Sequence, residues 1–383
     1  MRRLADGKCK VVIYGTGLNA VKWMFHYEQQ GGEVEYFLNT DSKIDMLCGK
    51  KVYSPNDEKV HDCYIVVAVS GMRLYLSISK QLQNYGLREF DDYIYYSWID
   101  KQIVLLHGNC HIWIVHKYLE SSEEFVQKYA IYPNPAICRN TMGEIEENIL
   151  KNSDVWIHEE IRTENRYGYK LSDEYIRQKI NPEVKEIIFP NLFGLGRMFF
   201  PNSNHNYKNN PMKNGQDTGA MFPCTDSLIE CCVEQGKNIE EIIEYVANDE
   251  ALCEEYVIKN FNLYMDKVKE REQICDIKIY DFIMEHYKDE QLFYDMGHPT
   301  NIILRKYSID ILKKLGIDDE NIHTTVELDA YEMPIYPSIK KHLGIRWEKE
   351  NIRQCQNAKR MCDKMNLEEY IYEYLWWCYN YRK

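Results

Sequence analysis

The stretch QIVLLHGNC, residues 102–110, decides the fold of this chain. Residues 103–106 are apolar and mostly branched, which is the composition of a strand buried on both faces of a parallel sheet. A glycine turn follows at once, and residues 112–119 then have the apolar spacing of a helix. A strand, a tight turn and a helix in this order predict an α/β domain with a parallel sheet.

The first hundred residues contain the same pattern. The runs KVVIY at 10–14, VEYFL at 34–38 and YIVVAV at 64–69 read as strands, and a helical stretch to about residue 30 follows the first. We therefore predict a Rossmann-like parallel-sheet domain over residues 1–100.

A second α/β domain is predicted over residues 101–383, with a helical C-terminal extension from about residue 318. Residues 201–223 are rich in Asn, Gly, Pro and His and read as a long loop of the kind that covers or forms a site. The other predicted elements are strands at 155–158, 186–189 and 291–294 and helices at about 225–268 and 300–315.

The composition limits the possible functions. The 383 residues carry 47 Lys and Arg against 60 Asp and Glu, a formal net charge of −13. A general nucleic-acid binder is excluded, because such proteins need a basic surface to displace counterions. No apolar run reaches the roughly 18 residues of a membrane helix. The 13 cysteines form no Cys-x-x-Cys pair and the histidines are scattered, so we expect a cytoplasmic protein with no disulfide framework and no metal site.

Gly15, Gly17 and Ala20 form a Gly-x-Gly-x-x-Ala turn between the first strand and its helix. Glycines there let the backbone approach a phosphate and present helix N-terminal amides to it, and a small third residue permits close packing. The acidic residue that would hold a ribose is displaced, since the second strand ends in Asn39 and the carboxylate follows at Asp41. Two interpretations stay open: a site for a sugar nucleotide, preferred over NAD, or a turn kept for packing alone.

Cys110 differs from the other cysteines because it ends the turn Gly108-Asn109-Cys110 between a strand and a helix. A side chain there lies at the carboxyl edge of the sheet, where ligands of open α/β sheets bind. The helix N-terminus also favours a thiolate and offers an amide to an oxyanion. Downstream, Asp295 precedes His298 by three residues, which lets the carboxylate orient the imidazole toward a nucleophile. We predict a Cys-His-Asp catalytic triad.

These two blocks resemble the first and last blocks of the SGNH hydrolase superfamily, with Cys in place of Ser and Asn in place of Asp in the first block. The Gly-Asn-Cys variant is typical of the WcbI-type polysaccharide biosynthesis acetyltransferases, which residues from about 102 to 345 resemble. The resemblance implies an SGNH-like α/β/α sandwich, coenzyme A as the acyl carrier and acetylation of a capsular or cell-surface saccharide. Supporting segments are SDVWIH at 153–158, FPNLFG at 189–194, HPT at 298–300 and PIYPS at 334–338.

Residues 9–95 resemble the nucleotide-binding-like N-terminal domains of bacterial sugar acyltransferases. In relatives with this pattern the second strand commonly ends in Asp, so Asn39 is a departure. The matching segments are VIYGTG at 12–17, FLNTD at 37–41, GKKV at 49–52 and IVVAV at 65–69.

The predicted reaction is acyl transfer from acetyl-CoA to a sugar hydroxyl. Cys110 attacks the thioester, His298 is the base and Asp295 holds the imidazole. Direct transfer, without an acetyl-cysteine, stays open. The oxyanion donors are the Cys110 amide and the side chains of Asn109 or Asn191, the last because it follows a strand roughly where SGNH enzymes place their oxyanion-hole Asn.

Asp154 and His158, from another strand, are candidate pocket residues, although a packing role is the simpler interpretation. Arg139, Arg162 and Arg197 are candidate partners for the phosphates of coenzyme A. Two other functions stay open: a carbohydrate esterase or deacetylase with the same triad, and a non-catalytic assembly protein that binds a sugar nucleotide. The sequence also leaves a homo-oligomer open.

Overall fold

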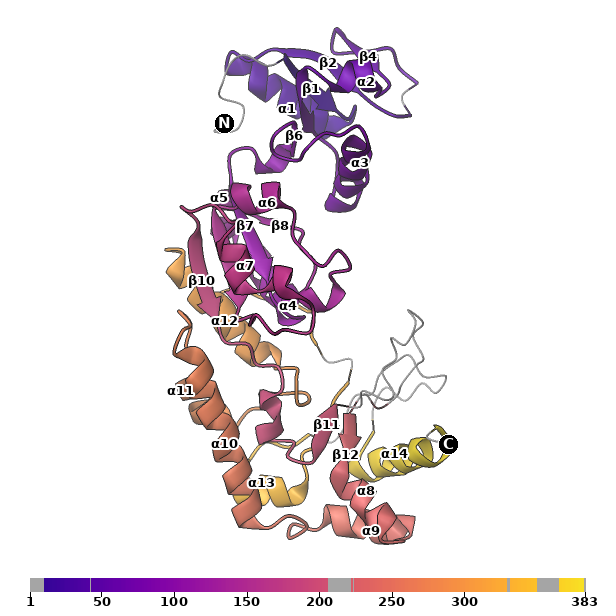
Figure 1. Ribbon diagram of the computed structural model, residues 1–383, viewed down its shortest axis with the longest axis vertical. Helices are drawn as coiled ribbons and strands as arrows, with labels where there is room; N and C mark the ends of the chain where they lie inside the picture. The colour runs from indigo at the N-terminus through magenta and orange to yellow at the C-terminus, as the bar shows by residue number, and fades with distance from the viewer. Residues whose placement is uncertain are drawn as a thin grey trace. The chain divides into compact units, whose positions relative to one another are not determined.

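The computed structural model describes residues 10–41, 43–205, 222, 224–328, 331–349 and 365–381 (Figure 1). Most of the predicted loop at 201–223 lies outside these residues. The contacts divide the chain into two compact units. The first contains residues 1–107, 123–157 and 161–186, and the second contains residues 108–122, 158–160 and 187–383. The predicted domain boundary at residue 100 stays a prediction.

A six-stranded sheet occupies the N-terminal part of the first unit, in the order β3-β4-β2-β1-β5-β6. The strands of this sheet pair in parallel, except that β3 is antiparallel to β4. Its inner strands are buried because their side chains are apolar on both faces. The elements are β1 (Lys10–Tyr14), α1 (Leu18–Gln29), β2 (Val34–Leu38), β3 (Met46–Leu47), β4 (Lys50–Tyr53), α2 (Asp57–Val60), β5 (Cys63–Val67), α3 (Met72–Asn84), β6 (Tyr93–Tyr95) and η1 (Tyr96–Trp98).

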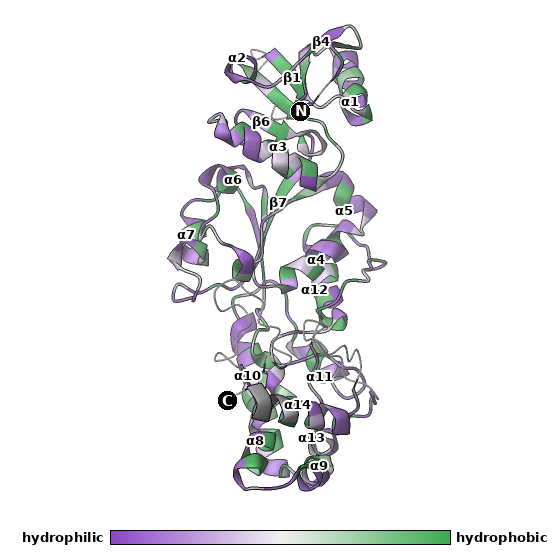
Figure 2. Cartoon of the chain, turned by 90° about the vertical axis from the view of Figure 1, so that its right-hand side faces the viewer, coloured by the Kyte–Doolittle hydropathy of each residue, from purple (hydrophilic) through white to green (hydrophobic). Residues whose placement is uncertain are grey.

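A second sheet has four strands in the order β10-β9-β7-β8, and β7 is parallel to β8. The predicted strands at 102–106, 155–158 and 186–189 are confirmed, each one residue longer. Figure 2 shows β1 and β7 coloured mainly as hydrophobic, in agreement with their burial. The elements are β7 (Gln102–His107), α4 (His111–Glu120), α5 (Glu123–Lys128), β8 (Tyr129–Tyr132), η2 (Ile137–Arg139), α6 (Glu147–Asn152), β9 (Val155–Glu159), η3 (Tyr169–Leu171), α7 (Asp173–Arg177) and β10 (Lys185–Phe189).

The C-terminal part is mainly helical. Local sequence sets several boundaries: a capping box between Asn238 and Glu241 begins α9, whereas Pro337 at the start of α13 and a left-handed Gly344 at its end limit that helix. The elements are η4 (Leu195–Met198), β11 (Ser203–His205), β12 (Cys224–Asp226), α8 (Ser227–Glu234), α9 (Ile239–Ala247), α10 (Glu254–Glu272), α11 (Tyr280–His286), α12 (Asn301–Lys314), α13 (Pro337–Leu343) and α14 (Leu367–Tyr381).

Mixed α/β architecture with parallel sheets and a helical C-terminal region is thus confirmed. Two local predictions were wrong. Residues 224–226 pair with β11 as a strand before the helices begin. Residues 291–294 form no strand, because only an isolated bridge joins Phe293 to Pro299. Within the described ranges, no helix is both long and apolar enough to span a membrane.

Candidate active site

Cys110 lies in the second unit, where β7 has ended and α4 begins. It is the residue before the first helical residue, His111, and its carbonyl accepts the Trp113 N–H at 3.1 Å. The turn needs glycine at position 108, because a Cβ there would lie 2.8 Å from Glu159 Oε2 and 2.9 Å from Ile112 Cγ2. The half-buried thiol is therefore held at the first turn of a helix by close packing beneath it.

Asp295 makes three hydrogen bonds within one loop, and two of them are to His298. Asp295 Oδ1 accepts the backbone N–H groups of Gly297 at 2.6 Å and His298 at 2.8 Å, and Oδ2 lies 2.7 Å from His298 Nδ1. The carboxylate is buried, whereas 35% of the His298 side chain is exposed. Since Nδ1 faces Asp295, Nε2 is the nitrogen left for the hydrogen bond between His298 and Cys110. The structure therefore brings the three predicted triad residues together.

The charges favour a thiolate beside an imidazolium. Burial raises the pKa of Cys110, but the hydrogen bond from His298 and the positive charge of His111 outweigh it, so the pKa lies below its ordinary value. Burial lowers the pKa of His298, but Asp295 and Cys110 together hold it well above its ordinary value. Burial likewise raises the pKa of Asp295, and the charge of His298 reverses the shift. The ionised forms of all three groups support one another.

Two buried residues at this site were missed by the sequence analysis. Glu159, at the end of β9, accepts the Asn109 N–H at 2.6 Å and lies 2.5 Å from His111 Nδ1. His111 Nε2 lies 3.0 Å from the carbonyl oxygen of Gly297. One sequence signal for Glu159 was available: it directly follows the buried strand residues VWIH at 155–158. A carboxylate in that position is expected to have a partner, because a charged residue is rarely buried without one.

The loop that carries Asp295 packs closely against η4. Gly196 donates to the Met296 carbonyl at 3.0 Å, and a side chain at position 196 would collide with the Asp295 carbonyl. Tyr294 N–H donates to the His298 carbonyl at 2.9 Å. The loop is thus closed on itself and held from one side by η4.

The other predicted residues of this site have different positions. Asp154 precedes β9 and its Oδ2 accepts the Ile103 N–H at 2.7 Å, so it lies at the start of the strand, away from the edge that carries the Cys110 turn. The prediction that it lines the pocket is not supported. His158 is fully buried and its Nδ1 is 2.9 Å from the Glu159 carbonyl. Because successive side chains of a strand face opposite ways, Glu159 rather than His158 reaches the site.

Asn109 and Asn191 stay candidates for oxyanion donors. The Asn109 N–H is already used by Glu159, which leaves its half-buried side chain. Asn191 Oδ1 accepts the Phe193 N–H at 2.9 Å, and Arg271 from α10 donates to the Asn191 carbonyl. These bonds give Asn191 a local role in the turn after β10.

Arg197 is the candidate phosphate partner best placed for this site. Its Nε is buried and has no hydrogen-bond partner among the described residues. Burial raises the pKa of Cys224, and the charges of Asp295 and Arg197 both act on that thiol, so the guanidinium lies near the loop that carries Asp295. Arg139 and Arg162 are exposed and belong to the first unit.

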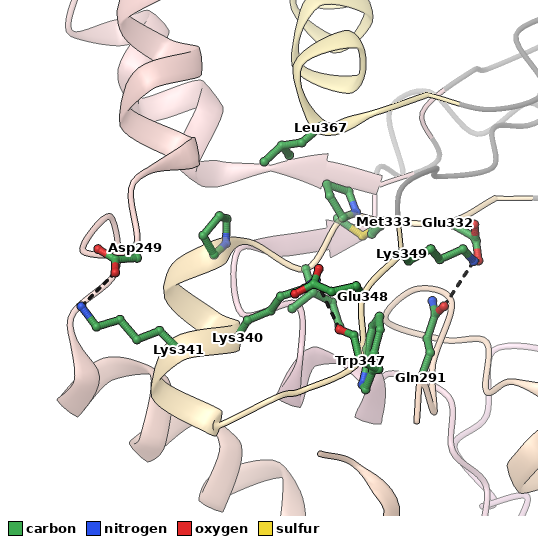
Figure 3. Close-up of a pocket in the computed structure, with 13 residues that line it drawn as sticks. Asp249, Gln291, Glu332, Met333, Lys340, Lys341, Trp347, Glu348, Lys349 and Leu367 are labelled. Carbon is green, nitrogen blue, oxygen red and sulfur yellow. Dashed lines mark hydrogen bonds and ion pairs between the residues drawn. The ribbon is translucent and has the colours of Figure 1, made fainter. Parts of the chain in front are cut away.

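A cavity of about 430 Å³ lies beside the segment that leads into Asp295 (Figure 3). Trp347 and Gln291 line it, together with three lysines and three carboxylates. Each lysine is paired with a carboxylate of the lining, and Lys341 is paired with Glu250 as well, so the lining carries no net positive charge and does not form the basic pocket that coenzyme A would need. The pairs are Lys340 with Glu348, Lys341 with Asp249, and Lys349 with Glu332.

The turn at residue 15 borders a different cavity, of about 520 Å³, in the first unit. Gly15 has a φ of +127°, and a Cβ there would lie 2.8 Å from the Ala68 carbonyl oxygen, so glycine is required. At Gly17 a Cβ would meet open space. Ala20 is fully buried against the sheet. Packing therefore explains two of the three small residues and leaves Gly17 for another role.

Among the described residues, the lining of this cavity combines neutral polar and apolar side chains with Asp41 and contains no Lys or Arg. Asn39 Nδ2 donates to Thr16 Oγ1 at 2.5 Å, and its Oδ1 accepts the Asp41 N–H at 3.0 Å. The carboxamide therefore organises the turn from the place where a ribose-binding carboxylate would stand. Asp41 lies exposed at the rim.

Among the described residues, no group of three or more His, Cys, Asp or Glu side chains could hold a metal ion.

Comparisons with known proteins found one matching family model and a similar solved structure. The family model described as polysaccharide biosynthesis enzyme WcbI matches residues 103–320. A solved structure of WcbI, described as the native protein without a disulfide bond between coenzyme A and one of its cysteines, superposes with a TM-score of 0.59. It is 18% identical, and the match covers 72% of this chain and 89% of that chain. Among curated proteins, none matches.

Proposed function

Because the chain belongs to the WcbI family of polysaccharide biosynthesis enzymes, we propose that it transfers an acetyl group from acetyl-CoA to a hydroxyl of a capsular or cell-surface saccharide precursor in the cytoplasm. The observation that carries the proposal is the contact of Cys110 with His298, itself held by Asp295. A thiolate beside an oriented imidazolium is the arrangement of a nucleophile and its acid–base partner.

In the first half of the reaction, Cys110 Sγ attacks the thioester carbonyl of acetyl-CoA as a thiolate. The carbon–sulfur bond to coenzyme A breaks, an acetyl-cysteine forms, and the departing thiolate takes the proton held on His298. The oxyanion that develops lies near the first turn of α4, where the Cys110 amide and the Asn109 side chain are the candidate donors.

In the second half, the sugar hydroxyl gives its proton to His298 as its oxygen attacks the acetyl carbon. The carbon–sulfur bond to Cys110 breaks, and the thiolate and imidazolium are restored. Asp295 keeps the ring in the tautomer and orientation that both halves require. The intermediate is a thioester like the donor, so the acetyl-enzyme is close in energy to acetyl-CoA.

Coenzyme A is the proposed carrier because the solved WcbI structure is described in terms of a disulfide between coenzyme A and a cysteine of that protein. In this chain, the half-buried Arg197, whose buried Nε has no hydrogen-bond partner among the described residues, lies near the loop of Asp295 and His298 and is the proposed partner of one phosphate group. The neutral cavity near Trp347 offers no net positive charge to the others.

Mass spectrometry after incubation with acetyl-CoA tests this function. We expect one acetyl group on the peptide that contains Cys110, absent in Cys110→Ala and retained in Cys231→Ala, which changes an exposed cysteine on α8. Ester hydrolysis without coenzyme A would instead support the esterase alternative. Lack of any adduct, with transfer retained in Cys110→Ala, would contradict the covalent route.

For the first unit we propose a sugar nucleotide in the 520 Å³ cavity. The helices α1 and α3 begin beside it after Gly17 and Gly71, and neither helix has a capping side chain or an acidic residue in its first turn. Such helix starts favour a phosphate. Titration with UDP-glucose as a probe tests this: saturable binding that is weakened by Asp41→Ala supports the site, and lack of binding by any nucleoside diphosphate sugar contradicts it.

A further inference from the structure

His111 and Glu159 form an ion pair whose side chains are completely buried. Each ring nitrogen of His111 faces an oxygen: Glu159 Oε1 lies 2.5 Å from Nδ1, and the Gly297 carbonyl lies 3.0 Å from Nε2. A carbonyl oxygen only accepts, and an ionised carboxylate only accepts. A ring with a proton on one nitrogen alone would place a lone pair against an oxygen, so the surroundings favour protons on both nitrogens.

The same pair connects the two halves of the catalytic site. Glu159 Oε2 accepts the N–H of Asn109, the residue before Cys110, at 2.6 Å. His111 reaches the carbonyl of Gly297, the residue before His298. A chain of three hydrogen bonds through buried atoms therefore joins the turn that carries the thiol to the loop that carries its base.

We propose that His111 is a positioning residue that stays doubly protonated on Glu159, fixes the Cys110 turn relative to the His298 loop, and places a second positive charge beside the thiolate. This inference rests on the proposed function only in taking Cys110 as the nucleophile. The position of His111 in the sequence supports the proposed role, because His111 is the first residue of α4 and directly follows Cys110.

The electrostatic surroundings agree with this role. Burial lowers the pKa of His111, but the charge of Glu159 and its hydrogen bond outweigh burial and raise the pKa to about 9. His111 lowers the pKa of Cys110 more than Glu159 raises it. The other ionisable groups that face the pair or the thiol are His298 with Asp295 in the neighbouring loop and Tyr307 on α12.

The test is the pH dependence of Cys110 alkylation by iodoacetamide, followed on the Cys110 peptide without any acyl donor. Thiolate reacts and thiol does not, so the midpoint of the profile reports the pKa of Cys110. His111→Gln should raise this midpoint by about one unit or more, which lowers the rate at pH 6.5 about tenfold. A purely structural role for His111 would leave the midpoint unchanged.

The double variant His111→Gln with Glu159→Gln removes both charges and so guards against misfolding caused by an unpaired buried carboxylate. Its midpoint should also rise, by less than that of the single variant, because Glu159 no longer opposes the thiolate. The matched control is His116→Gln on the same helix, whose partner Glu120 lies 2.9 Å away at the surface; it should leave the midpoint in place.

The outcomes separate this inference from the proposed function. An unchanged midpoint in the folded double variant overturns the role of His111 while the acetyl-cysteine proposal stands. A wild-type midpoint at the ordinary value of a free thiol, about 8.5, contradicts the thiolate nucleophile itself. A rise in both variants, with the His116→Gln profile unchanged, supports the positioning role.

Discussion

The turns at residues 15–17 and 108–110 both join a buried strand of a parallel sheet to the first turn of a helix. In both, the first glycine is required because another group closely approaches it: the Ala68 carbonyl at Gly15, and the Glu159 carboxylate at Gly108. The two turns are therefore alike in backbone design. They differ in what surrounds them.

The first turn has neutral polar groups around it, and the described residues that line its cavity include one carboxylate, Asp41, and no lysine or arginine. The second is surrounded by ionisable side chains in direct contact with it or with one another: Cys110, His111, Glu159, Asp295 and His298. A turn of the first kind can present backbone amides to an anion, whereas a turn of the second kind controls the charge of a side chain. This difference in surroundings is the basis for proposing binding at the first turn and chemistry at the second.

The largest expected effect is loss of the chemistry at the second turn. Cys110→Ala and His298→Ala should each slow acetyl transfer by about 10³-fold or more, and the double variant should be no slower than the worse single one, because the residues act as a unit. Formation of the acetyl-enzyme from acetyl-CoA, measured by rapid quenching and mass spectrometry, checks this.

The matched change in the first unit is Asn39→Ala, which disturbs the turn at residue 15 without touching the triad. It should leave the rate of Cys110 acetylation within about twofold of the wild-type rate. If His298→Ala retained more than a tenth of the activity, the imidazole would not be the base and the contrast between the turns would fail.

The next effect concerns stability. Gly108→Ala places a Cβ against Glu159 and forces the buried ion pair apart, so we expect a loss of about 4 kcal/mol in the free energy of unfolding. Gly15→Ala should cost about 2 kcal/mol, because its positive φ strains any other residue. Urea denaturation followed by circular dichroism measures both. A Gly108→Ala protein as stable as wild type would show that the packing beneath Cys110 can relax.

The sequence was sufficient to predict the strands around both turns and the pairing of Asp295 with His298, because these follow from local apolar runs and from a short spacing. The contact of this pair with Cys110 was expected from the family resemblance, and the catalytic role of the three residues stays a prediction. The sequence was not sufficient for Glu159 and His111, whose contact spans 48 positions in the chain, or for the bond from His111 to Gly297, which spans 186. Such pairs depend on which strand lies next to β7. Local patterns do not carry that information.

Asp154 is a second case in which local sequence patterns did not give the position of a side chain. The sequence makes Asp154 a pocket candidate because it adjoins a strand, with packing as the simpler interpretation. Asp154 precedes β9, whereas Glu159 at the other end of that strand reaches Asn109 and His111. The strand predicted at 291–294 failed because its residues pair with no neighbouring strand and instead enter a tight loop. In both cases the missing information was the direction or the partner of a segment.

A smaller effect follows from the titration of His111. Its folded-state pKa of about 9 lies above the ordinary 6.5, so the stabilisation is complete below pH 6.5 and is lost as the pH rises through 9. The difference corresponds to about 3 kcal/mol. The thermal midpoint of the wild type should therefore fall between pH 7 and pH 10 more steeply than that of the His111→Gln, Glu159→Gln double variant. Parallel curves for the two proteins would contradict an ionised His111.

The smallest effect on stability is expected at Gly17, which contrasts with the packed glycines. Its φ of −84° suits alanine, and an added Cβ would meet open space. Alanine is less favourable than glycine at the N-cap, which destabilises the Gly17→Ala variant. Alanine also lowers the conformational entropy of the unfolded chain, which stabilises the variant. The two effects oppose each other, so the free energy of unfolding should change by less than about 0.5 kcal/mol. If Gly17 serves a phosphate, the same variant should weaken UDP-glucose binding about tenfold, since the methyl group would occupy the mouth of the cavity. Calorimetric titration of a protein with unchanged stability therefore separates a binding turn from one kept for folding alone.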